Sequence, residues 1–553
     1  MNRLTKTCLS VLAAGSVAIT VHAQTGAIIP VFSFSGGTTN GAAPEGSMVL
    51  GPDGSFYGTT EGGGTNNYGT IFKITTGGAL TTLVNFNGTN GDEPVGALTL
   101  GPDGNIYGTT VYGGTNFGSA STPGSLGAGS IFRLTTNGLL TTLATFVITN
   151  GENPHAGLTW GPGGLFYGTT GGGGPAGYGT IFSMTTSGTL TMLTNFNNAN
   201  GNAPFAGLTV GPDGNLYGVC QSGGTHGVGT VFKVAANGMM LTNLYNFGAT
   251  TTDGAFPQTT MTFGPDGNLY GVTAFTSSAN NDGTIFKITT NGTLTTLINW
   301  DFYNGGEPLG SLTLGPDGAF YSTTYLGDNG NGSINKGIVY SLTTNGVFTV
   351  LAQFTGPDGA YPISGVTLGP DNNFYGVTSG GGTNNASGAV YRLGLSPIFV
   401  SNPASQSVII GNSAAFSSQM FGTAPFGFQW RSNSVPVAGV TGGSLGVPHV
   451  FYSANNAQIQ VVATNTYGSA TSQVANLSVV LQPNCAAIVN NGGGNYTVTV
   501  GSYPSSMNHL WATTNLSSSW QQIAPITTDA NGMGQYPDTD TADPAKFYRL
   551  SNP

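Results

Sequence analysis

Acidic side chains are the residues in this sequence with the clearest capacity for chemistry. Of the 21 Asp and Glu, six lie in a repeated Gly-Pro-Asp turn and eleven more lie in longer connections between expected strands. These eleven could bind a cation, a basic partner or an amine-bearing glycan, and carboxylates with backbone carbonyls suit Ca²⁺. The alternative is that they are solubilising loop charges, because no segment has the alternating Asp/Asn spacing of a calcium loop. The candidate ligand-binding residues are Glu45, Asp92, Glu93, Glu152, Asp253, Glu307 and Asp358.

Signals for catalysis are weaker. Glu93, Glu152 and Glu307 occupy similar connections, and two of them facing each other could act as a carboxylate pair in glycoside cleavage. Nothing in the sequence selects such a pair over ordinary surface charge. His155 is the nearest candidate base, and the alternative is an ordinary loop residue. The histidines and cysteines show no His-x-x-x-His or Cys-x-x-Cys pairing, which argues against a zinc site. We therefore assign no catalytic residue and no metal centre.

The elements that must position these side chains recur along the chain. A Gly-Pro-Asp-Gly turn or a close variant is followed by an apolar-Tyr pair, a Gly-rich stretch, a Gly-Thr-Ile-Phe type strand and a Leu-Thr-Thr-Leu-x-x-Phe type strand. Four short β-rich segments in about 50 residues are typical of one blade of a β-propeller. The seven copies of the turn begin at residues 51, 101, 161, 211, 264, 315 and 369.

The points at which the first and last copies of the repeat begin and end predict how the two ends of the repeat region meet. The last copy, residues 369–395, contains only three strands, and an unmatched strand, residues 29–34, precedes the first copy. We therefore expect an all-β fold with a seven-bladed β-propeller over residues 26–395, in which the N-terminal strand closes the last blade. In that arrangement the long connections share one face, which carries all eleven acidic residues. The basic residues Lys73, Arg133, Lys233, Lys287 and Arg392 point toward the opposite rim.

The repeated turn and its tyrosine have structural explanations. Pro fixes φ, Asp caps neighbouring N–H groups and Gly accepts positive φ, so backbone geometry alone accounts for Gly-Pro-Asp-Gly. The recurrent Tyr-Gly pairs could stack on carbohydrate, but seven copies at one position are better explained by packing between neighbouring sheets.

The repeat resembles a known family, the GloVer tandem repeat of exported bacterial proteins. The resemblance lies in the Leu-Tyr-Gly-Thr-Thr, Gly-Gly-Gly, Gly-Thr-Ile-Phe-Lys and Leu-Thr-Thr-Leu-x-x-Phe segments and covers about two-thirds of the chain. It implies secretion and a tandem β architecture. It supplies no catalytic residues.

Two further units follow the repeats. Residues 397–481 resemble a bacterial immunoglobulin-like β-sandwich, in which Trp430 takes the place of the buried tryptophan. Ser418 and Val461 stand where an antibody-type domain has its disulfide cysteines, so this domain relies on core burial. Residues 482–553 look like a small β-rich C-terminal domain of exported proteins. We expect Cys220 and Cys485 to be two unpaired, partly buried thiols, and the alternative is a bridge between them.

The N-terminus and the composition limit the location and the partners. Residues 1–23 have the charged start, short apolar stretch and small-residue cleavage site of a signal peptide, so we expect a secreted, extracellular or cell-surface protein. The formal net charge is −10 and only 6% of residues are charged. Nucleic acid is therefore excluded as a partner. Once the N-terminus is set aside, no apolar run reaches the ~20 residues of a membrane span.

The functional expectation is a monomeric, non-enzymatic binding or surface-scaffold protein. Its long-loop face would meet an extracellular carbohydrate or protein ligand. No cofactor is assigned, although the carboxylates of this face could bind Ca²⁺. The alternatives are an extracellular polysaccharide hydrolase or lyase and a purely structural envelope component, since fold does not decide function.

Overall fold

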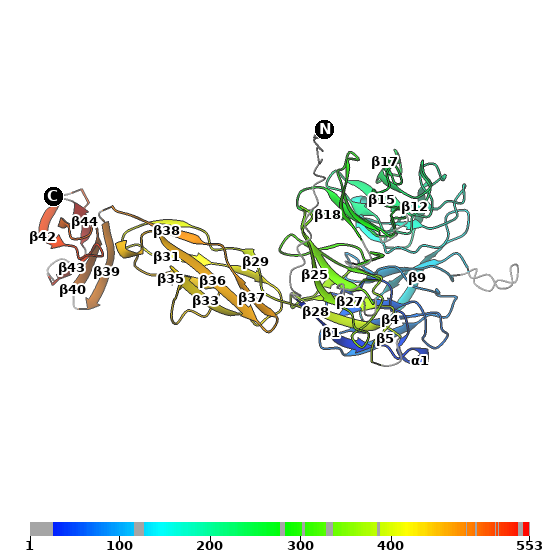
Figure 1. The fold of residues 1–553 in the computed structure, drawn as a ribbon, viewed down its shortest axis with the longest axis horizontal. Coiled ribbons are helices and arrows are strands. Elements are labelled where there is room, and N and C mark those ends of the chain that lie inside the picture. The colour runs from blue at the N-terminus through cyan, green and yellow to red at the C-terminus, as the bar shows by residue number, and fades with distance from the viewer. Residues whose placement is uncertain are drawn as a thin grey trace, which may run out of the picture. The chain divides into compact units, whose positions relative to one another are not determined.

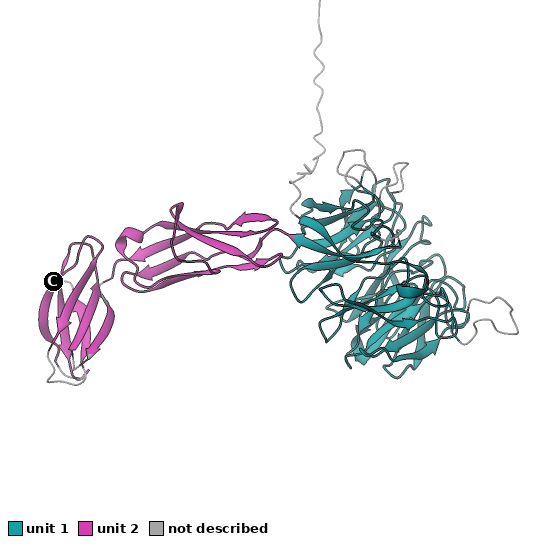
Figure 2. Ribbon diagram, turned by 90° about the horizontal axis from the view of Figure 1, so that it is seen from below, with its two compact units in different colours: residues 1–394 teal, residues 395–553 magenta. Residues whose placement is uncertain are grey.

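The computed structural model describes most of the chain in two compact units, residues 1–394 and 395–553 (Figure 2). The described residues are 26–114, 127–276, 283–300, 305–327, 336–383, 387–482, 484–492, 495–514, 516–517, 519–539 and 546–551. The predicted signal peptide, residues 1–23, lies outside them, as do Asp282, Asp301 and Asp328, which belong to the eleven loop acids.

The repeats of the first unit form four-stranded antiparallel sheets (Figure 1). Each sheet starts with a strand of two or three residues, and the second and third strands are buried almost throughout. The first three sheets are β2 (Val49–Leu50), β3 (Phe56–Thr60), β4 (Thr70–Ile74) and β5 (Leu80–Asn85); β6 (Thr99–Leu100), β7 (Ile106–Thr110), β8 (Ser130–Leu134) and β9 (Leu140–Thr145); and β10 (Thr159–Gly161), β11 (Leu165–Thr170), β12 (Thr180–Met184) and β13 (Leu190–Asn195).

Three more sheets repeat the same strand order. They are β14 (Thr209–Val210), β15 (Asn215–Cys220), β16 (Thr230–Ala235) and β17 (Thr242–Asn246); β18 (Thr262–Phe263), β19 (Leu269–Thr273), β20 (Thr284–Ile288) and β21 (Leu294–Asn299); and β22 (Thr313–Leu314), β23 (Phe320–Thr324), β24 (Ile338–Leu342) and β25 (Phe348–Gln353). A four-residue helix, α1 (Gly37–Asn40), and a 3₁₀ turn, η1 (Pro162–Gly164), lie in connections.

The last sheet of this unit joins the two ends of the repeat region. It contains β26 (Thr367–Leu368), β27 (Phe374–Thr378) and β28 (Ala389–Leu395), and its fourth strand is β1 (Gly26–Ser33). Figure 1 shows β1 beside β28. The pairing leaves Phe34 fully buried.

The predicted fold class requires a correction. The all-β class is confirmed, but the closed seven-bladed propeller is wrong in that form, because the strands make separate small sheets and no strand ladder runs from one sheet to the next to close a barrel or propeller. The physical reason lies in the connections between sheets, where glycines at positive φ turn the chain away from the strand that it has just formed; Gly91 and Gly151, at φ 132° and 130°, are two of them.

Aromatic side chains fill the space between neighbouring sheets. The tyrosine of the second strand packs on the residue that precedes the corresponding tyrosine in the next sheet, with ring centroids 4.3 Å apart for Tyr107 and Phe166 and 4.6 Å apart for Tyr375 and Phe56. The tyrosines at this position are at most 2% exposed. Packing between sheets, rather than ligand stacking, therefore accounts for the repeated tyrosine.

The repeated turn is held by its aspartate. Asp213 accepts hydrogen bonds from the Asn215 backbone N–H at 3.1 Å and from the Tyr217 hydroxyl at 2.9 Å, and Lys233 Nζ lies 2.7 Å from its carboxylate. Lys73 and Lys287 make the corresponding ion pairs in the first and fifth sheets. The turn aspartates and the repeated lysines thus stabilise the rim opposite the long connections.

The second unit contains two groups of strands. The first group has two strand pairs: β29 (Ile398–Ser401) with β32 (Gln419–Phe421), and β31 (Ala414–Ser417) with β35 (Ser444–Val447). It also has a larger sheet, in the order β30 (Gln406–Ile409), β38 (Ala475–Val480), β36 (Ala457–Asn465), β33 (Gly427–Ser432) and β34 (Val435–Pro436). β37 (Gly468–Thr471) pairs with β36, and the 3₁₀ turn η2 (Tyr452–Ala454) lies in a connection. Trp430 is fully buried in its core and donates its indole N–H to Gly442 O at 2.9 Å.

The second group of strands forms two three-stranded sheets. They are β39 (Asn484–Gly492), β40 (Asn495–Gly501) and β43 (Met533–Asp538), and β42 (Gln521–Thr527), β41 (Met507–Thr513) and β44 (Phe547–Ser551). Their small core is built from Val498, Val500, Leu510 and Ile526.

Candidate functional site

A Gly-x-x-Pro loop precedes the first strand of every sheet in the first unit. All seven prolines are buried, and each loop lies at the end of its sheet opposite the Gly-Pro-Asp-Gly turn. The motif recurs in the sequence at the repeat spacing. The predicted site residues are all acidic, so they do not include the motif as such. The prolines are Pro44, Pro94, Pro154, Pro204, Pro257, Pro308 and Pro362.

The residue before each proline adopts a left-handed backbone conformation although none is glycine. The seven φ values run from 49° at Glu307 to 59° at Tyr361. Such a conformation costs on the order of 1 kcal/mol or more and persists only where the surroundings fix it. In the second loop, Glu93 donates its N–H to Tyr68 O at 3.3 Å and accepts the Val111 N–H at 3.1 Å. Backbone hydrogen bonds on both sides therefore fix where the residue after the proline lies.

The prolines also require glycine in the preceding sheet. A Cβ on Gly129, which lies at φ 98°, would stand 2.7 Å from Pro154 Cδ. The same relation holds between Gly388 of the last repeat and Pro44 of the first, at 2.6 Å. The glycine of the Gly-Thr-Ile-Phe segment is thus needed for the close approach of the next loop.

The residue after each proline differs in every repeat, yet all seven of these residues line one cavity of about 130 Å³, which we call the throat. Each is half-buried. A second cavity of about 370 Å³, the shared cavity, adjoins the throat, since Ser47, Ala97, Gly157, Gly207, Thr260 and Ser311 line both. The seven variable residues of the throat are Glu45, Val95, His155, Phe205, Gln258, Leu309 and Ile363.

Two hydroxyl groups in the throat wall have no hydrogen-bond partner among the described residues. Thr259 Oγ1 and Ser364 Oγ are buried, and their residues are only 7% and 6% exposed. Buried polar groups in folded proteins are nearly always hydrogen-bonded to protein, water or ligand. The two hydroxyl oxygens are sealed from solvent, so they belong to the packed wall around the throat and not to its open surface.

One carboxylate, that of Glu45, lines the throat, and the charges of other carboxylates act on it. Burial, followed by the charge of Glu61, a hydrogen bond with Glu61 and the charge of Glu93, raises the pKa of Glu45 to about 8. Burial and then the charge of Glu93 raise the pKa of Asp92 to about 6. The pKa of Glu93 is raised by burial and by Glu61. We call Glu45, Glu61, Asp92 and Glu93 the acidic sector.

The remaining throat wall is uncharged. Burial lowers the pKa of His155 to about 4, so its imidazole is neutral at physiological pH, and its ring centroid lies 4.4 Å from that of Phe205. The sequence left two interpretations of His155, a candidate base and an ordinary loop residue. The structure places it in the lining of the throat.

The other predicted ligand-binding residues do not join the acidic sector. Asp253 accepts hydrogen bonds from the Tyr245 hydroxyl at 2.8 Å and the Ala249 N–H at 3.0 Å, and Asp358 accepts the Thr355 N–H at 2.8 Å. Asparagines at the same repeat position accept equivalent bonds, as Asn150 does from Val147. Asp253 and Asp358 therefore cap their loops. Glu152 pairs through its backbone with Gly172, and Glu307 precedes Pro308 of the sixth loop.

Metal and thiol chemistry find little support in the described part of the chain. No group of three or more His, Cys, Asp or Glu there could hold a metal ion, so Ca²⁺ stays a prediction. Cys220 is a buried free thiol, and burial raises its pKa. Cys220 is therefore unpaired, and the side chain of Cys485 lies outside the described residues. Among the described helices, none has the length and apolar character of a membrane span.

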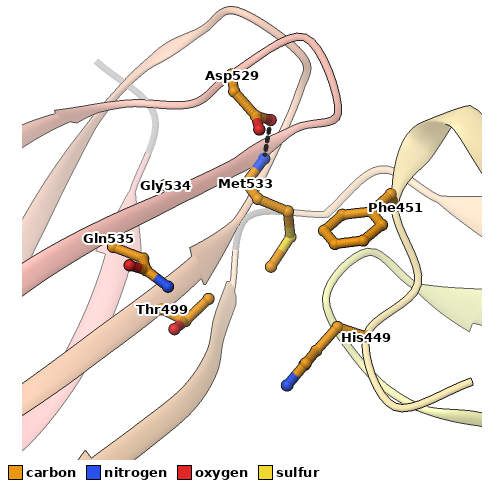
Figure 3. A pocket seen from close by; sticks show the side chains of 7 residues that line it. All are labelled: His449, Phe451, Thr499, Asp529, Met533, Gly534 and Gln535. Atoms are coloured by element: carbon orange, nitrogen blue, oxygen red, sulfur yellow. Dashed lines mark hydrogen bonds between the residues drawn. The ribbon is translucent and has the colours of Figure 1, made fainter.

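The second unit has a pocket of its own, of about 320 Å³ (Figure 3). His449 and Phe451 line one side, and Met533 extends from β43 toward Phe451. Asp529 in this wall caps its own turn by accepting the Met533 N–H at 2.9 Å, and His449 Nδ1 lies 3.1 Å from Gly411 O. Because these polar groups already have partners, the pocket is a weaker candidate than the throat.

Comparison with known proteins adds a family match. The family model described as the Gloeobacter/Verrucomicrobia repeat matches residues 13–118 and 116–334, which together are more than half of the chain. A search of the curated proteins finds no match.

Solved structures match only over short parts of the chain. A twitchin kinase region from C. elegans is 21% identical, with 15% of this chain and 16% of that chain covered and a TM-score of 0.14. A chimeric titin Z1Z2 that carries a peptide from decorin is 28% identical over 16% of this chain and 96% of that chain, also with a TM-score of 0.14. Tandem Ig repeats of Dlar are 17% identical over 22% of this chain and 68% of that chain, with a TM-score of 0.15.

Proposed function

This chain belongs to the Gloeobacter/Verrucomicrobia repeat family, and from this premise we propose that it is an exported, non-enzymatic binding protein whose ligand enters the throat. The ligand class is an extracellular carbohydrate or protein. The proposal includes a monomeric chain, whose seven repeats together line the throat.

The observation that carries the proposal is the contrast within each Gly-x-x-Pro loop. The glycine and the proline recur in every repeat, and the residue before the proline always has the same left-handed conformation. Only the residue after the proline changes character, from the acidic Glu45 through the aromatic Phe205 to the amide Gln258. A rigid framework that presents seven different side chains to one cavity is suited to recognising a ligand of particular shape and polarity.

The carboxylates favour binding over glycoside cleavage. A glycosidase holds its two carboxyl groups about 5–9.5 Å apart to accommodate the sugar or a water. The pKa of Glu45 is instead raised by burial and then by the charge of Glu61, so Glu45 holds its proton near neutral pH. Of the predicted catalytic set, Glu93 raises the pKa of Glu45 through its charge, whereas Glu152 and Glu307 lie on the third and sixth loops and are not among the groups that raise it.

The remaining parts of the chain fit a protein that displays a binding unit outside the cell. Residues 1–23 serve as its signal peptide. Residues 397–481 are an immunoglobulin-like spacer, which is supported by the buried Trp430 and by the parallel pairing of β30 with β38. Residues 482–553 form a small terminal β domain, and the two together present the repeat unit to its ligand.

The proposal is tested by incubating the chain from residue 24 onward with insoluble and soluble polysaccharides and with immobilised extracellular proteins, with and without Ca²⁺. Retained protein and released sugars are measured together. We expect retention without sugar release. Release of sugars that stops when Glu45 is replaced by Gln would contradict the non-enzymatic assignment.

A matched pair of variants locates the site. Phe205→Ala removes a half-buried aromatic side chain from the throat, and Leu139→Ala removes an exposed aliphatic side chain, 66% accessible, from the opposite end of a sheet. We expect Phe205→Ala to weaken retention at least tenfold and Leu139→Ala to leave it unchanged. Equal retention by both variants would place the site elsewhere.

A further inference from the structure

We propose that the solvent side of the sheet β42-β41-β44 binds an acidic polysaccharide. Arg549 pairs with a carboxylate of a sugar acid, and the aromatic side chains around it pack on the sugar. The site goes beyond the proposed function, because it lies outside the throat and gives the terminal β domain a ligand of its own. We call Trp511, Trp520 and Arg549 the indole–guanidinium cluster.

The indole–guanidinium cluster lies on the outer face of its sheet. Leu510 on β41 is fully buried in the domain core, so the next residue, Trp511, points to the opposite face. Tyr548 and Leu550 on β44 pack against the same core, which places Arg549 between them on the outer face. Trp511 and Arg549 are also direct partners across the two strands.

Two indole rings hold the guanidinium of Arg549. Its Cζ atom lies 5.4 Å from the ring centroid of Trp511 and 4.6 Å from that of Trp520. At these distances the π electrons of an indole attract a cation. Trp511 is itself fixed, because its indole N–H donates to Ser551 Oγ at 2.9 Å. The guanidinium is therefore positioned by the protein, which lowers the entropy cost of binding a ligand to it.

The guanidinium has no counter-ion among the described residues. The ion pairs there involve three lysines of the first unit and Lys546 of the second, and none includes Arg549. The strands β41, β42 and β44 contain no Asp or Glu. Arg549 is exposed, and the planar fork of a guanidinium matches the two oxygens of a carboxylate. A carboxylate from a ligand is the group that complements this charge.

A second polar pair extends the same face. Gln522 Nε2 on β42 lies 2.8 Å from His509 Nδ1 on β41. An amide nitrogen only donates, so Nδ1 accepts this hydrogen bond and the neutral imidazole carries its proton on Nε2. His509 pairs across the strands with Ser551, beside the indole–guanidinium cluster. The face thus offers a further N–H donor for the hydroxyl and carboxylate oxygens of a sugar acid.

Exposed apolar side chains flank the indole–guanidinium cluster. Phe547, two residues before Arg549 on β44, is 43% exposed, and Met507, at the start of β41, is 55% exposed. Exposed apolar surface with a polar rim marks an interaction site. The C–H groups on one side of a sugar ring are apolar and are buried favourably on such side chains. A polymer of sugar acids has both that apolar side and a carboxylate on every ring, whereas an acidic peptide has the carboxylates alone.

The first experiment is a calorimetric titration of the chain from residue 24 onward with trigalacturonate, with its methyl ester as the uncharged counterpart. Esterification removes the charge and keeps the sugar rings. We expect saturable binding of the acid, at least tenfold weaker binding of the ester, and weaker binding of the acid as the salt concentration rises. Equal binding of acid and ester, or no binding of the acid, would overturn the inference.

A matched pair of arginine variants locates the site. Arg549→Gln removes the charge of the indole–guanidinium cluster, and Arg431→Gln removes another exposed arginine of the same unit, on β33. We expect Arg549→Gln to weaken trigalacturonate binding at least tenfold and Arg431→Gln to leave it unchanged. Arg549→Lys, which keeps the charge and loses the planar fork, should bind with intermediate affinity. Full binding by Arg549→Gln would overturn the inference. The comparison of acid and ester on the unchanged chain does not depend on how well the variants fold.

A peptide probe tests the other class of acidic ligand. Acetyl-triglutamate amide carries the same number of carboxylates as trigalacturonate but has no sugar ring. We expect it to bind at least tenfold more weakly. Equal binding of the two would overturn the assignment to a polysaccharide.

A throat variant separates this inference from the proposed function. Phe205→Ala should leave trigalacturonate binding unchanged, since Phe205 lines the throat of the first unit. If Phe205→Ala abolishes trigalacturonate binding and Arg549→Gln does not, the ligand enters the throat and the present inference fails. If trigalacturonate does not bind while Phe205→Ala still abolishes retention on another ligand, the present inference fails and the proposed function stands.

Discussion

A single hydroxyl distinguishes the last repeat from five of the others. The third strand of those sheets places a phenylalanine against a glycine of the second strand, as Phe72 does against Gly58. The last sheet has Tyr391 at this position, fully buried, with its hydroxyl pressed against Gly376 and without a hydrogen-bond partner among the described residues. A buried polar group without a partner costs about 1–3 kcal/mol. The tyrosine is thus a local source of instability.

Tyr391→Phe should raise the free energy of unfolding by about 1 kcal/mol, because it removes the unpaired hydroxyl and keeps the ring. The change is measured by guanidinium denaturation. Tyr375→Phe is the matched control; its hydroxyl donates to Asp371 at 2.8 Å, so its removal should lower the free energy of unfolding by about 1 kcal/mol. Destabilisation by Tyr391→Phe would show that this hydroxyl has a partner.

At the scale of the element, the two- or three-residue first strand of each sheet carries a link to its neighbour. Thr99 Oγ1 donates a hydrogen bond to Leu158 O at 2.5 Å. In the last sheet, Thr367 Oγ1 donates to the carbonyl of Met48, the residue just before the first strand of the first sheet, at 2.6 Å. Thr159, Thr209, Thr262 and Thr313 make the same hydrogen bond to the following sheet. In the first sheet, β2 has Val49 at this position, which has no hydroxyl.

Adding and removing this hydroxyl should have opposite effects on stability. Thr367→Val should lower the free energy of unfolding by about 1–2 kcal/mol, since it leaves the Met48 carbonyl without its donor. Val49→Thr, which supplies the missing hydroxyl, should raise it by about 0.5–1 kcal/mol. Both are measured by urea denaturation of the chain. Equal effects of the same sign would show that the threonines act through packing and not through these hydrogen bonds.

The strands and turns of the repeat unit are easier to predict from the sequence than the residues of its candidate site. Strand segments and Gly-Pro-Asp-Gly turns follow from local alternation and turn chemistry, which are properties of neighbouring residues. The Gly-x-x-Pro loops were missed because a residue before proline is expected to be extended, whereas Glu93 and its counterparts are left-handed. The raised pKa of Glu45 depends on Glu61 and Glu93, which only the fold brings near it. Asp253 and Asp358 act as the asparagines of other repeats do, which composition alone does not reveal.

At the scale of the whole molecule, the repeat unit depends on pairing between its two ends. β1 is hydrogen-bonded to β28, and the Phe34 backbone N–H donates to Gly388 O at 2.9 Å. Without β1, the buried strand β28 becomes an exposed edge, which is a template for pairing with another chain. The ring of Phe34, which packs on Phe72 at 5.2 Å in the neighbouring sheet, would also be lost.

Deletion of residues 26–36 should therefore do more than remove one strand. Loss of the Phe34 side chain alone costs about 1.5–3 kcal/mol of apolar burial, and the exposed β28 edge should drive self-association. We expect the truncated chain to elute as aggregates in size-exclusion chromatography and to melt at a lower temperature than the intact chain. A synthetic peptide of residues 26–36 added in trans should restore a monomer, whereas the same peptide with Phe34→Ala should not. A monomeric truncated chain with an unchanged melting temperature would show that β28 tolerates an open edge, and that the first unit is held together by contacts between neighbouring sheets alone.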